Sequence, residues 1–340
     1  MVSRTASPRV RRAYRLLQVG VCAVLVAALA VSVVLKVQPV RELFYPWLTI
    51  YVKEPGHEHS GHFYLYDSIL GWRNVPNWVA TTRGRPLTIN SQGLRDREYA
   101  YVKPAGTGRI LVLGDSFTWG YGVSDADLFT ELLERQLASR EPAWQVINTG
   151  VSGWGTDQQF LYFRDEGFRY EPDVVVLACY LLNDPREVMV SDVYGLSKPV
   201  FLDTDLALGN VPVPLPSRPK TGLKSSVEGF RLMVRLIDAI RQECEKRNCR
   251  LLVMKFRTFA DPTVGGLKEL DGLFEAEFAR LRNRIGYLDL DEKFRERKIE
   301  AKYLVAGNED NHWNDFGHQQ VALILGEFLE QQGWLEQLGQ

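Results

Sequence analysis

A serine stands just beyond an apolar, strand-like run. Residues 110–113 read Ile-Leu-Val-Leu, and Gly114, Asp115 and Ser116 follow them. A buried strand that ends in this way can place a serine hydroxyl at the carboxyl edge of a sheet, where ligands bind in open α/β folds. Such a hydroxyl can act as a nucleophile if a base, an acid that orients the base and oxyanion donors lie nearby. Gly-Asp-Ser alone is a weak signal, because most serines after a strand are turn or cap residues.

Candidates for the other roles follow later strand-like runs. The turn after the second run contains Gly150 and Gly153, and a glycine lets a bare backbone N–H approach a ligand. Asn183 follows the third run, and its side-chain amide can donate to a developing oxyanion. His312 precedes the last predicted helix as a candidate base, with Asp310 or Glu309 able to hold its second ring nitrogen.

Strands and helices alternate from Arg109 onward, which is typical of an α/β fold with a parallel sheet. We expect strands over residues 109–114, 144–148, 173–179, 251–256 and 285–290. We expect helices from a capping box at Ser124 to about residue 139, from Thr156 as cap to Gly167, from Ser225 through Cys244, over 266–283 and over 315–331.

Residues 191–224 interrupt this alternation. Apolar runs on either side of a turn predict a hairpin, and the prolines that follow predict an extended strap. Because the segment follows the third strand, it should lie beside the sheet edge that carries Ser116. It could form a lid or a substrate wall there, and a passive loop is the alternative.

The amino end predicts a membrane anchor. Residues 1–15 contain five arginines and no acid, and residues 16–35 contain no charge. A helix of that length spans about 30 Å, the thickness of a bilayer core. The arginines should keep the amino end in the cytoplasm, with the catalytic domain periplasmic or extracellular. We expect a single-pass signal-anchor; a cleaved signal peptide, with a cleavage site at residues 28–30, is the alternative.

The remaining composition is that of a globular protein. The 340 residues, of which 45% are apolar, suit one large domain with extensions, and a net charge of −1 gives no reason to expect nucleic acid as a partner. Residues 36–106 should form a connector and an irregular extension packed on the main domain. The histidines at 57, 59 and 62 favour a solvated loop over a metal site, and Cys244 and Cys249 could be either a disulfide or two buried thiols.

Together, these blocks resemble a known family, the SGNH/GDSL hydrolases. They are Gly114-Asp115-Ser116-Phe117, Gly153, Asn183-Asp184 and an acid-x-His that ends at His312. The resemblance covers about residues 107–332. It implies a three-layer, flavodoxin-like fold around a central, mostly parallel five-stranded sheet, in a domain that we place at residues 107–334. It also implies a serine esterase that needs neither a metal nor an organic cofactor.

The resemblance implies a role for each matching residue. Ser116 would be the nucleophile and, through its N–H, one oxyanion donor; Gly153 and Asn183 would be the other donors. His312 would be the general base and then the acid for the leaving group. Asp310 is the expected orienting acid, in an acid-x-His-Trp pattern that looks like proteins of alginate O-acetylation. The family's usual acid-x-x-His spacing makes Glu309 the alternative.

Other residues near these motifs are expected to be structural. Asp115 should bond the backbone beside the nucleophile, Asp184 should brace the loop after the third strand, and His318 should pack in the last helix. Gly150 competes weakly with Gly153 as an oxyanion donor. Leu181 departs from the family, which often has glycine there, and this leaves the local backbone less certain.

The function expected from the resemblance is hydrolysis of an ester through an acyl-serine. With an outward-facing domain, acetylated envelope glycans, peptidoglycan and lipid esters are natural substrates. A polysaccharide O-acetyltransferase with the same triad is an alternative. A non-catalytic envelope scaffold or glycan-binding protein is an alternative of another class.

Overall fold

The computed structural model describes residues 8–36, 51–53, 63–213, 226–257, 267–307 and 310–336. The chain divides into two compact units, residues 1–50 and residues 51–340, and each is described by itself. His57, His59 and His62 lie outside the described residues, so the expected loop there is not tested.

The first unit contains one helix, α1 (Pro8–Lys36). The structure describes the side chains of its residues 16–30, and all of them are exposed. Among the described residues, no helix is both long enough and apolar enough to cross a membrane. The structure therefore gives no support to the transmembrane helix that the sequence predicts over residues 16–35.

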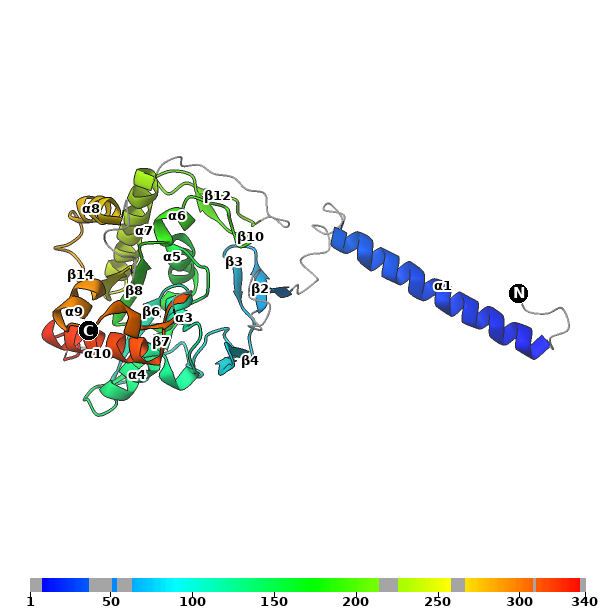
Figure 1. The fold of residues 1–340 in the computed structure, drawn as a ribbon, viewed down its shortest axis with the longest axis horizontal. Helices are drawn as coiled ribbons and strands as arrows, with labels where there is room; N and C mark the ends of the chain where they lie inside the picture. Colours follow the sequence, from blue (N-terminus) through cyan, green and yellow to red (C-terminus); the bar gives the residue numbers. More distant parts are fainter. Residues whose placement is uncertain are drawn as a thin grey trace. The chain divides into compact units, whose positions relative to one another are not determined.

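A five-stranded parallel sheet forms the centre of the second unit (Figure 1). Its strands are β6 (Thr107–Leu113), β7 (Ala143–Asn148), β8 (Val174–Tyr180), β13 (Arg250–Phe256) and β14 (Gly286–Asp289). The order is β14-β13-β8-β6-β7, and every pair is parallel. This is the flavodoxin-like order, in which the direction of winding reverses between β6 and β8. The α/β sheet expected from the sequence is confirmed, and each strand lies within two residues of its predicted bounds.

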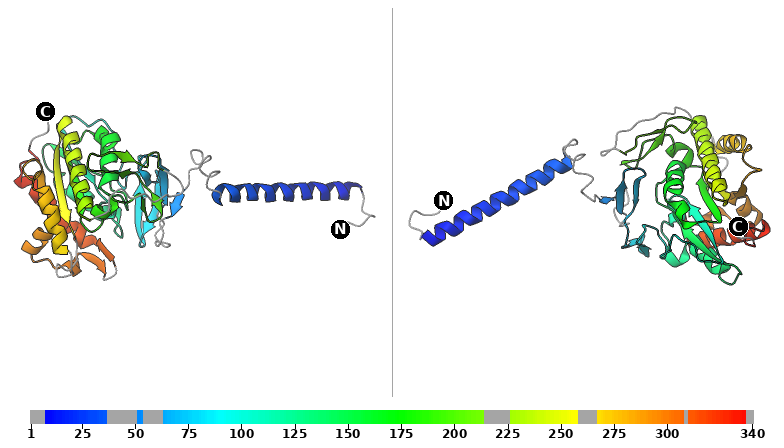
Figure 2. Two further views of the ribbon diagram at one scale, coloured as in Figure 1. Left: turned by 90° about the horizontal axis from the view of Figure 1, so that it is seen from above. Right: turned by 180° about the vertical axis from the view of Figure 1, so that it is seen from behind.

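Helices cover both faces of this sheet (Figures 1 and 2). One layer contains α4 (Phe129–Leu137), α9 (Leu290–Glu296) and α10 (Asp315–Gln331); the other contains α5 (Thr156–Asp165), α7 (Ser226–Lys246) and α8 (Leu267–Phe278). Alternate residues of β6 face the two layers: Ile110 packs with the first and Leu111 with the second. Burial on both faces explains why the strands are continuously apolar.

Two predicted helix starts are wrong. Ser124 makes no side-chain capping bond; residues 125–127 form a 3₁₀ turn, η2 (Asp125–Asp127), and Leu128 is extended, so α4 begins only at Phe129. Thr156 is the first residue of α5, and Gly155 is its N-cap. In both places the local pattern is overridden by packing, since Phe129 and Thr156 are buried.

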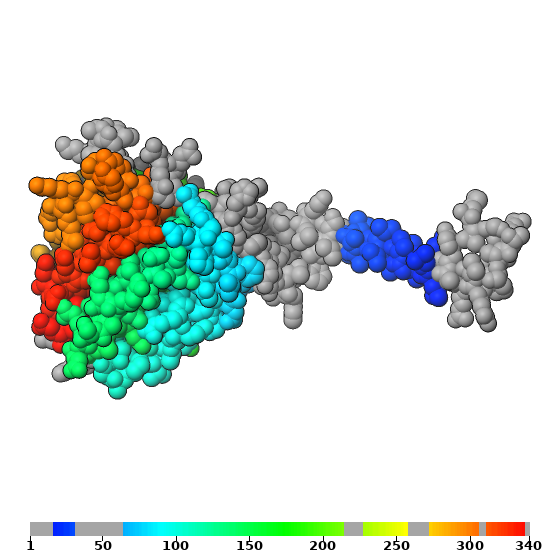
Figure 3. Space-filling model, turned by 60° about the horizontal axis from the view of Figure 1, so that its bottom comes forward, coloured from blue at the N-terminus to red at the C-terminus, as the bar shows by residue number. Residues whose placement is uncertain are grey.

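The segment before the sheet is more regular than expected. β2 (Phe63–Asp67) pairs with β1 (Tyr51–Lys53) and β3 (Gly71–Asn74), and β4 (Trp78–Thr82) pairs with β5 (Arg85–Ile89) in a hairpin. The buried Arg109 guanidinium donates to the carbonyls of Ala100, Tyr101 and Tyr170, which fastens the end of this segment to β6. Figure 3 shows its cyan surface beside the green surface of α4.

The insertion after β8 contains the predicted hairpin. A short helix, α6 (Asp184–Glu187), comes first; two small hairpins follow, β9 (Asp192–Val193) with β10 (Leu196–Ser197) and β11 (Val200–Phe201) with β12 (Leu208–Gly209). Residues 214–224 of the expected strap lie outside the described residues.

A buried ionic cluster joins this insertion to the core. Lys198 lies between the two hairpins, and its ammonium is 2.5 Å from Asp157 Oδ2 and donates to Glu187 O at 2.7 Å. All three residues are fully buried. The Glu187 carboxyl oxygens have no hydrogen-bond partner within the described residues, and burial raises the pKa of Glu187 to about 8. This carboxyl therefore holds a proton near neutral pH.

We expect Gly71→Ala to disrupt the packing of the insertion on β3. Gly71 has φ +87°, and a Cβ there would overlap the Ser197 carbonyl oxygen and lie 3.0 Å from Lys198 Cα. The control is Gly106→Ala, which has φ +71° and open space around its Cβ, so it adds only backbone strain of about 1 kcal/mol. In urea melts, Gly71→Ala should lower the free energy of unfolding by at least about 2 kcal/mol more than Gly106→Ala does. Equal losses for the two variants would contradict the close approach.

Glu187→Gln should change the pH dependence of stability. As pH rises from about 4.5 towards 8, the unfolded carboxyl ionises while the folded one keeps its proton, so wild type loses stability. Glutamine cannot ionise, so the free energy of unfolding of the variant should gain on wild type by up to a few kcal/mol across this range, then level off. Urea melts at several pH values measure the difference, with exposed Glu300→Gln as control. If the difference in unfolding free energy between Glu187→Gln and wild type does not depend on pH, the pKa of Glu187 is not raised by folding.

Candidate active site

The turn after β6 sets the position of Ser116. Ser116 is the first residue of a short helix, α3 (Ser116–Trp119), and Asp115 caps it by accepting the Phe117 N–H at 2.9 Å. A Cβ at Gly114 would overlap Thr118 Oγ1, so the turn requires glycine there. Ser116 thus lies at the carboxyl end of β6, beside the point where the winding of the sheet reverses.

His312 approaches the serine from the opposite end of the chain. It lies in β16 (Asp310–Trp313), which pairs with β15 (Val305–Gly307). Its Nε2 is 2.7 Å from Ser116 Oγ, across 196 residues of sequence. The rings of Phe117 and Tyr121 pack against the imidazole, with centroids 4.8 and 4.7 Å from its own. This is hydrogen-bond distance for a base that accepts the hydroxyl proton.

The structure does not decide between the two candidate acids. Asp310 begins β16, and its backbone pairs with Gly307. The Asp310 side chain and the whole of Glu309 lie outside the described residues. The choice of Asp310 over Glu309 stays a prediction.

Gly153 lies in the loop between β7 and α5. Its φ is +78°, and Trp72 and Tyr194 ring atoms lie 3.3 Å from the position of a Cβ. Trp72 Nε1 donates to Ser152 O at 3.1 Å and so fixes this loop from the N-terminal segment. Gly150 does not compete with Gly153, because its N–H donates to Asn148 Oδ1 at 2.9 Å.

Asn183 connects its loop to the nucleophile turn. Its Nδ2 lies 3.3 Å from Asp115 Oδ2. An amide nitrogen carries two hydrogens, so this bond leaves one for another acceptor. Leu181, the departure from the family pattern, is buried and donates its N–H to Phe256 O at 3.1 Å. The loop is therefore held by backbone bonds despite the missing glycine.

The residues expected to be structural do bond as predicted. Asp115 is fully buried, and burial raises its pKa to about 6 although its oxygens accept from Phe117 and Asn183. Asp184 Oδ2 accepts the Tyr180 N–H at 2.9 Å, and burial raises the pKa of this carboxyl well above its usual range.

His318 is a packing residue. Its Nδ1 accepts the Phe129 N–H at 3.0 Å, and burial lowers its pKa to about 3, so the ring stays neutral. Cys244 and Cys249 are buried free thiols.

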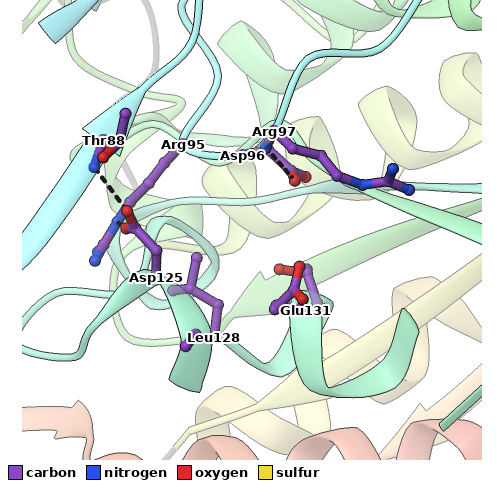
Figure 4. A pocket seen from close by; sticks show the side chains of 9 residues that line it. Thr88, Arg95, Asp96, Arg97, Asp125, Leu128 and Glu131 are labelled. Carbon is purple, nitrogen blue, oxygen red and sulfur yellow. Dashed lines mark hydrogen bonds and ion pairs between the residues drawn. The ribbon is translucent and has the colours of Figure 1, made fainter. Parts of the chain in front are cut away.

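Arg95 is a residue that the sequence analysis missed. Its buried guanidinium donates to the carbonyls of Trp119, Gly120 and Val123, and pairs with Asp125 at 2.9 Å. It thereby holds the loop that follows α3. Figure 4 shows Arg95 and Asp125 on the wall of a pocket of about 340 Å³. No local pattern around Arg95 signals this role, because all the carbonyls that it binds come from a later segment.

Two hairpins outside the sheet contact the site. At the turn between β4 and β5, the Arg83 guanidinium lies 5.3 Å from the Tyr121 ring centroid, and Tyr121 packs on His312. At the turn between β9 and β10, Tyr194 lies against Gly153 with 45% of its surface exposed. Tyr194 of the insertion therefore lies beside the candidate oxyanion loop. The lid or substrate wall stays a prediction, with a passive loop as the alternative.

The solved structures that match the chain share little of its sequence, and the TM-scores are low. A lipase/acylhydrolase from Enterococcus faecalis is 16% identical, with a TM-score of 0.41, over 66% of this chain and 96% of its own. Esterase EstA from Pseudoalteromonas sp. is 14% identical, with a TM-score of 0.43, over 68% and 100%. The hydrolase LAE5 from the metagenome of Lake Arreo is 18% identical, with a TM-score of 0.45, over 69% and 98%.

Family membership rests on the sequence of the domain itself. No curated protein matches the chain. The model of the GDSL-like lipase/acylhydrolase family matches residues 112–320, which begin in β6 and end inside α10 and so include Ser116, Gly153, Asn183 and His312. The chain therefore belongs to the GDSL-like lipase/acylhydrolase family, as the order of its motifs predicted.

Proposed function

We propose that this ester hydrolase acts through an acyl-serine on Ser116. The observation that carries the proposal is the 2.7 Å contact between Ser116 Oγ and His312 Nε2. The imidazole takes the hydroxyl proton while Oγ attacks the ester carbonyl, and it returns that proton to the leaving alcohol. Water then attacks the acyl-serine with His312 as base, which releases the acid and restores the serine.

The oxyanion is proposed to rest on three donors: the Ser116 N–H, the Gly153 N–H and Asn183 Nδ2. Within the described part of the chain, the two backbone N–H groups donate no hydrogen bond. The second amide hydrogen of Asn183 is the third donor. Donors fixed before reaction stabilise the developing charge without reorganisation. We propose Asp310 as the acid that orients His312, with Glu309 as the alternative.

We propose an acylated glycan as the substrate. Support comes from Tyr194, whose ring is partly exposed beside Gly153. An exposed aromatic face can pack against the C–H face of a sugar ring, which would hold the glycan while its ester enters the site. A lipid ester is the alternative substrate.

The hydrolase should fail without its nucleophile. We expect purified wild type to hydrolyse p-nitrophenyl acetate and to react with a fluorophosphonate probe. Ser116→Ala should lose at least about 10⁴-fold in kcat and all labelling. A Ser116→Ala variant that keeps its activity would overturn the proposed nucleophile. Adding a sugar acceptor to the wild-type reaction separates hydrolysis, which releases acetate, from acetyl transfer, which modifies the sugar.

The same assay resolves the orienting acid. Asp310→Asn should lower kcat by orders of magnitude, whereas Glu309→Gln should change it by only a few-fold. Both substitutions preserve side-chain size, so the comparison isolates the carboxylate charge. The reverse ranking would assign the role to Glu309.

We also propose that residues 16–35 anchor the protein in a membrane with its hydrolase domain outside the cytoplasm. Support comes from the 20 uncharged residues, from the five arginines before them and from the exposure of the side chains at 16–30. Full-length protein should sediment with membranes and resist washing with high salt, while a variant lacking residues 1–35 should not. External protease should degrade a tag at the carboxyl end of the chain in spheroplasts. Full-length protein in the soluble fraction would contradict the anchor.

A further inference from the structure

Lys198 lies where a lysine is costly. Its side chain is fully buried, and a buried ammonium needs close partners to offset its lost hydration. The surrounding backbone is fixed from two directions. Lys198 N donates to Ser191 O at 2.9 Å, and Asn210 Nδ2 donates to Lys198 O at 2.7 Å. Gly71 of β3 packs against Ser197 and Lys198 from the N-terminal segment.

The two partners of the ammonium belong to the two segments that carry candidate oxyanion donors. Asp157 Oδ2, at 2.5 Å, lies in the first turn of α5, four residues after Gly153. Glu187 O, at 2.7 Å, ends α6, four residues after Asn183. The Glu187 N–H donates back to Asn183 O at 2.9 Å, so the position of Glu187 restrains the position of Asn183.

The nucleophile turn completes the connection. Asn183 Nδ2 bonds Asp115 Oδ2, and Asp115 Oδ1 bonds the Phe117 N–H in the helix that begins with Ser116. The Lys198 ammonium therefore bonds both the segment that follows Gly153 and the segment that follows Asn183. Asp115 in turn connects Asn183 to the helix that begins with Ser116. An oxyanion hole depends on the spacing of its donors, because a misplacement of about 1 Å can lower the rate about 100-fold.

We propose that Lys198 is a positioning residue that sets the distance between the Gly153 and Asn183 donors, so that the insertion is required for transition-state stabilisation. The inference rests on the proposed function. Lys198 touches no reacting atom; it acts through Asp157 and through the last carbonyl of α6. Its loss should weaken binding of the transition state and leave ground-state binding of the ester nearly unchanged.

The test compares full-length Lys198→Met with wild type on p-nitrophenyl acetate, with kcat expressed per site titrated by the fluorophosphonate probe. We expect kcat to fall about 10- to 100-fold while KM changes less than about 3-fold, since part of an oxyanion interaction is lost. The matched control is Lys103→Met. Lys103 pairs with Asp173 at 2.7 Å just before β8, at the opposite end of the strands. The Lys103→Met variant should have a lower Tm and the same kcat as wild type.

A second variant separates position from stability. Lys198→Met with Asp157→Leu replaces the buried pair by apolar groups of similar size, which should restore Tm. We expect its kcat to stay low. If the double variant recovers both its Tm and a kcat within about 3-fold of wild type, the inference is overturned. An equal loss of kcat in Lys103→Met would also overturn it.

Failure of the proposed function has a different signature, namely wild type without turnover or labelling that depends on Ser116. In that case the amide NMR signals of Gly153 and of the Asn183 side chain still report the positions of the two loops. Shifts of both signals in Lys198→Met but not in Lys103→Met support the positioning role. Unchanged signals overturn it.

Discussion

The contact between Ser116 Oγ and His312 Nε2 joins residues that are 196 positions apart, and no local structure could hold it at 2.7 Å. The sheet makes it possible. β6 ends at the point where the winding reverses, so the turn that follows it opens onto the carboxyl edge. The β15–β16 hairpin then brings His312 to the same edge just before α10. A register slip of one residue in β6 would turn its side chains to the opposite face and break the contact.

Polar groups, rather than apolar ones, fix the loops around that contact. Arg95, Asp115 and Lys198 are almost wholly removed from water, and each is bonded to loops that surround the site. Apolar packing tolerates small shifts, whereas charged hydrogen bonds restrict both distance and direction. The desolvation of these groups is offset by their partners. In the Lys198–Asp157 pair both side chains are fully buried, so removal of either one would leave the other as an unpaired buried charge. The site is therefore built on interactions that favour fixed positions over high stability.

The sequence predicted the sheet and the polar end of each strand, but not what surrounds them. The strands were found because burial on both faces requires continuous apolar runs, such as Val174–Tyr180. The capping pattern at Ser124 misled, because Leu128 adopts an extended conformation before α4. Lys198 and Arg95 gave no signal at all, since their partners lie in distant segments and a lone basic residue normally lies at the surface. Long-range polar bonds of this kind have no period and no fixed spacing.

Two segments outside the central sheet, residues 63–106 and 191–213, both contact the loop that carries Gly153. Trp72, from the segment before the sheet, bonds Ser152, while Tyr194, from the insertion, packs on Gly153. Gly71 and Lys198 bring these two segments together behind the same loop. We therefore expect substitutions in either segment to shift the position of Gly153, even when the residues of the family motifs are unchanged. In this chain, residues 63–106 and 191–213 should therefore influence the rate of the reaction, because they contact the loop that carries Gly153 and help to hold it in place.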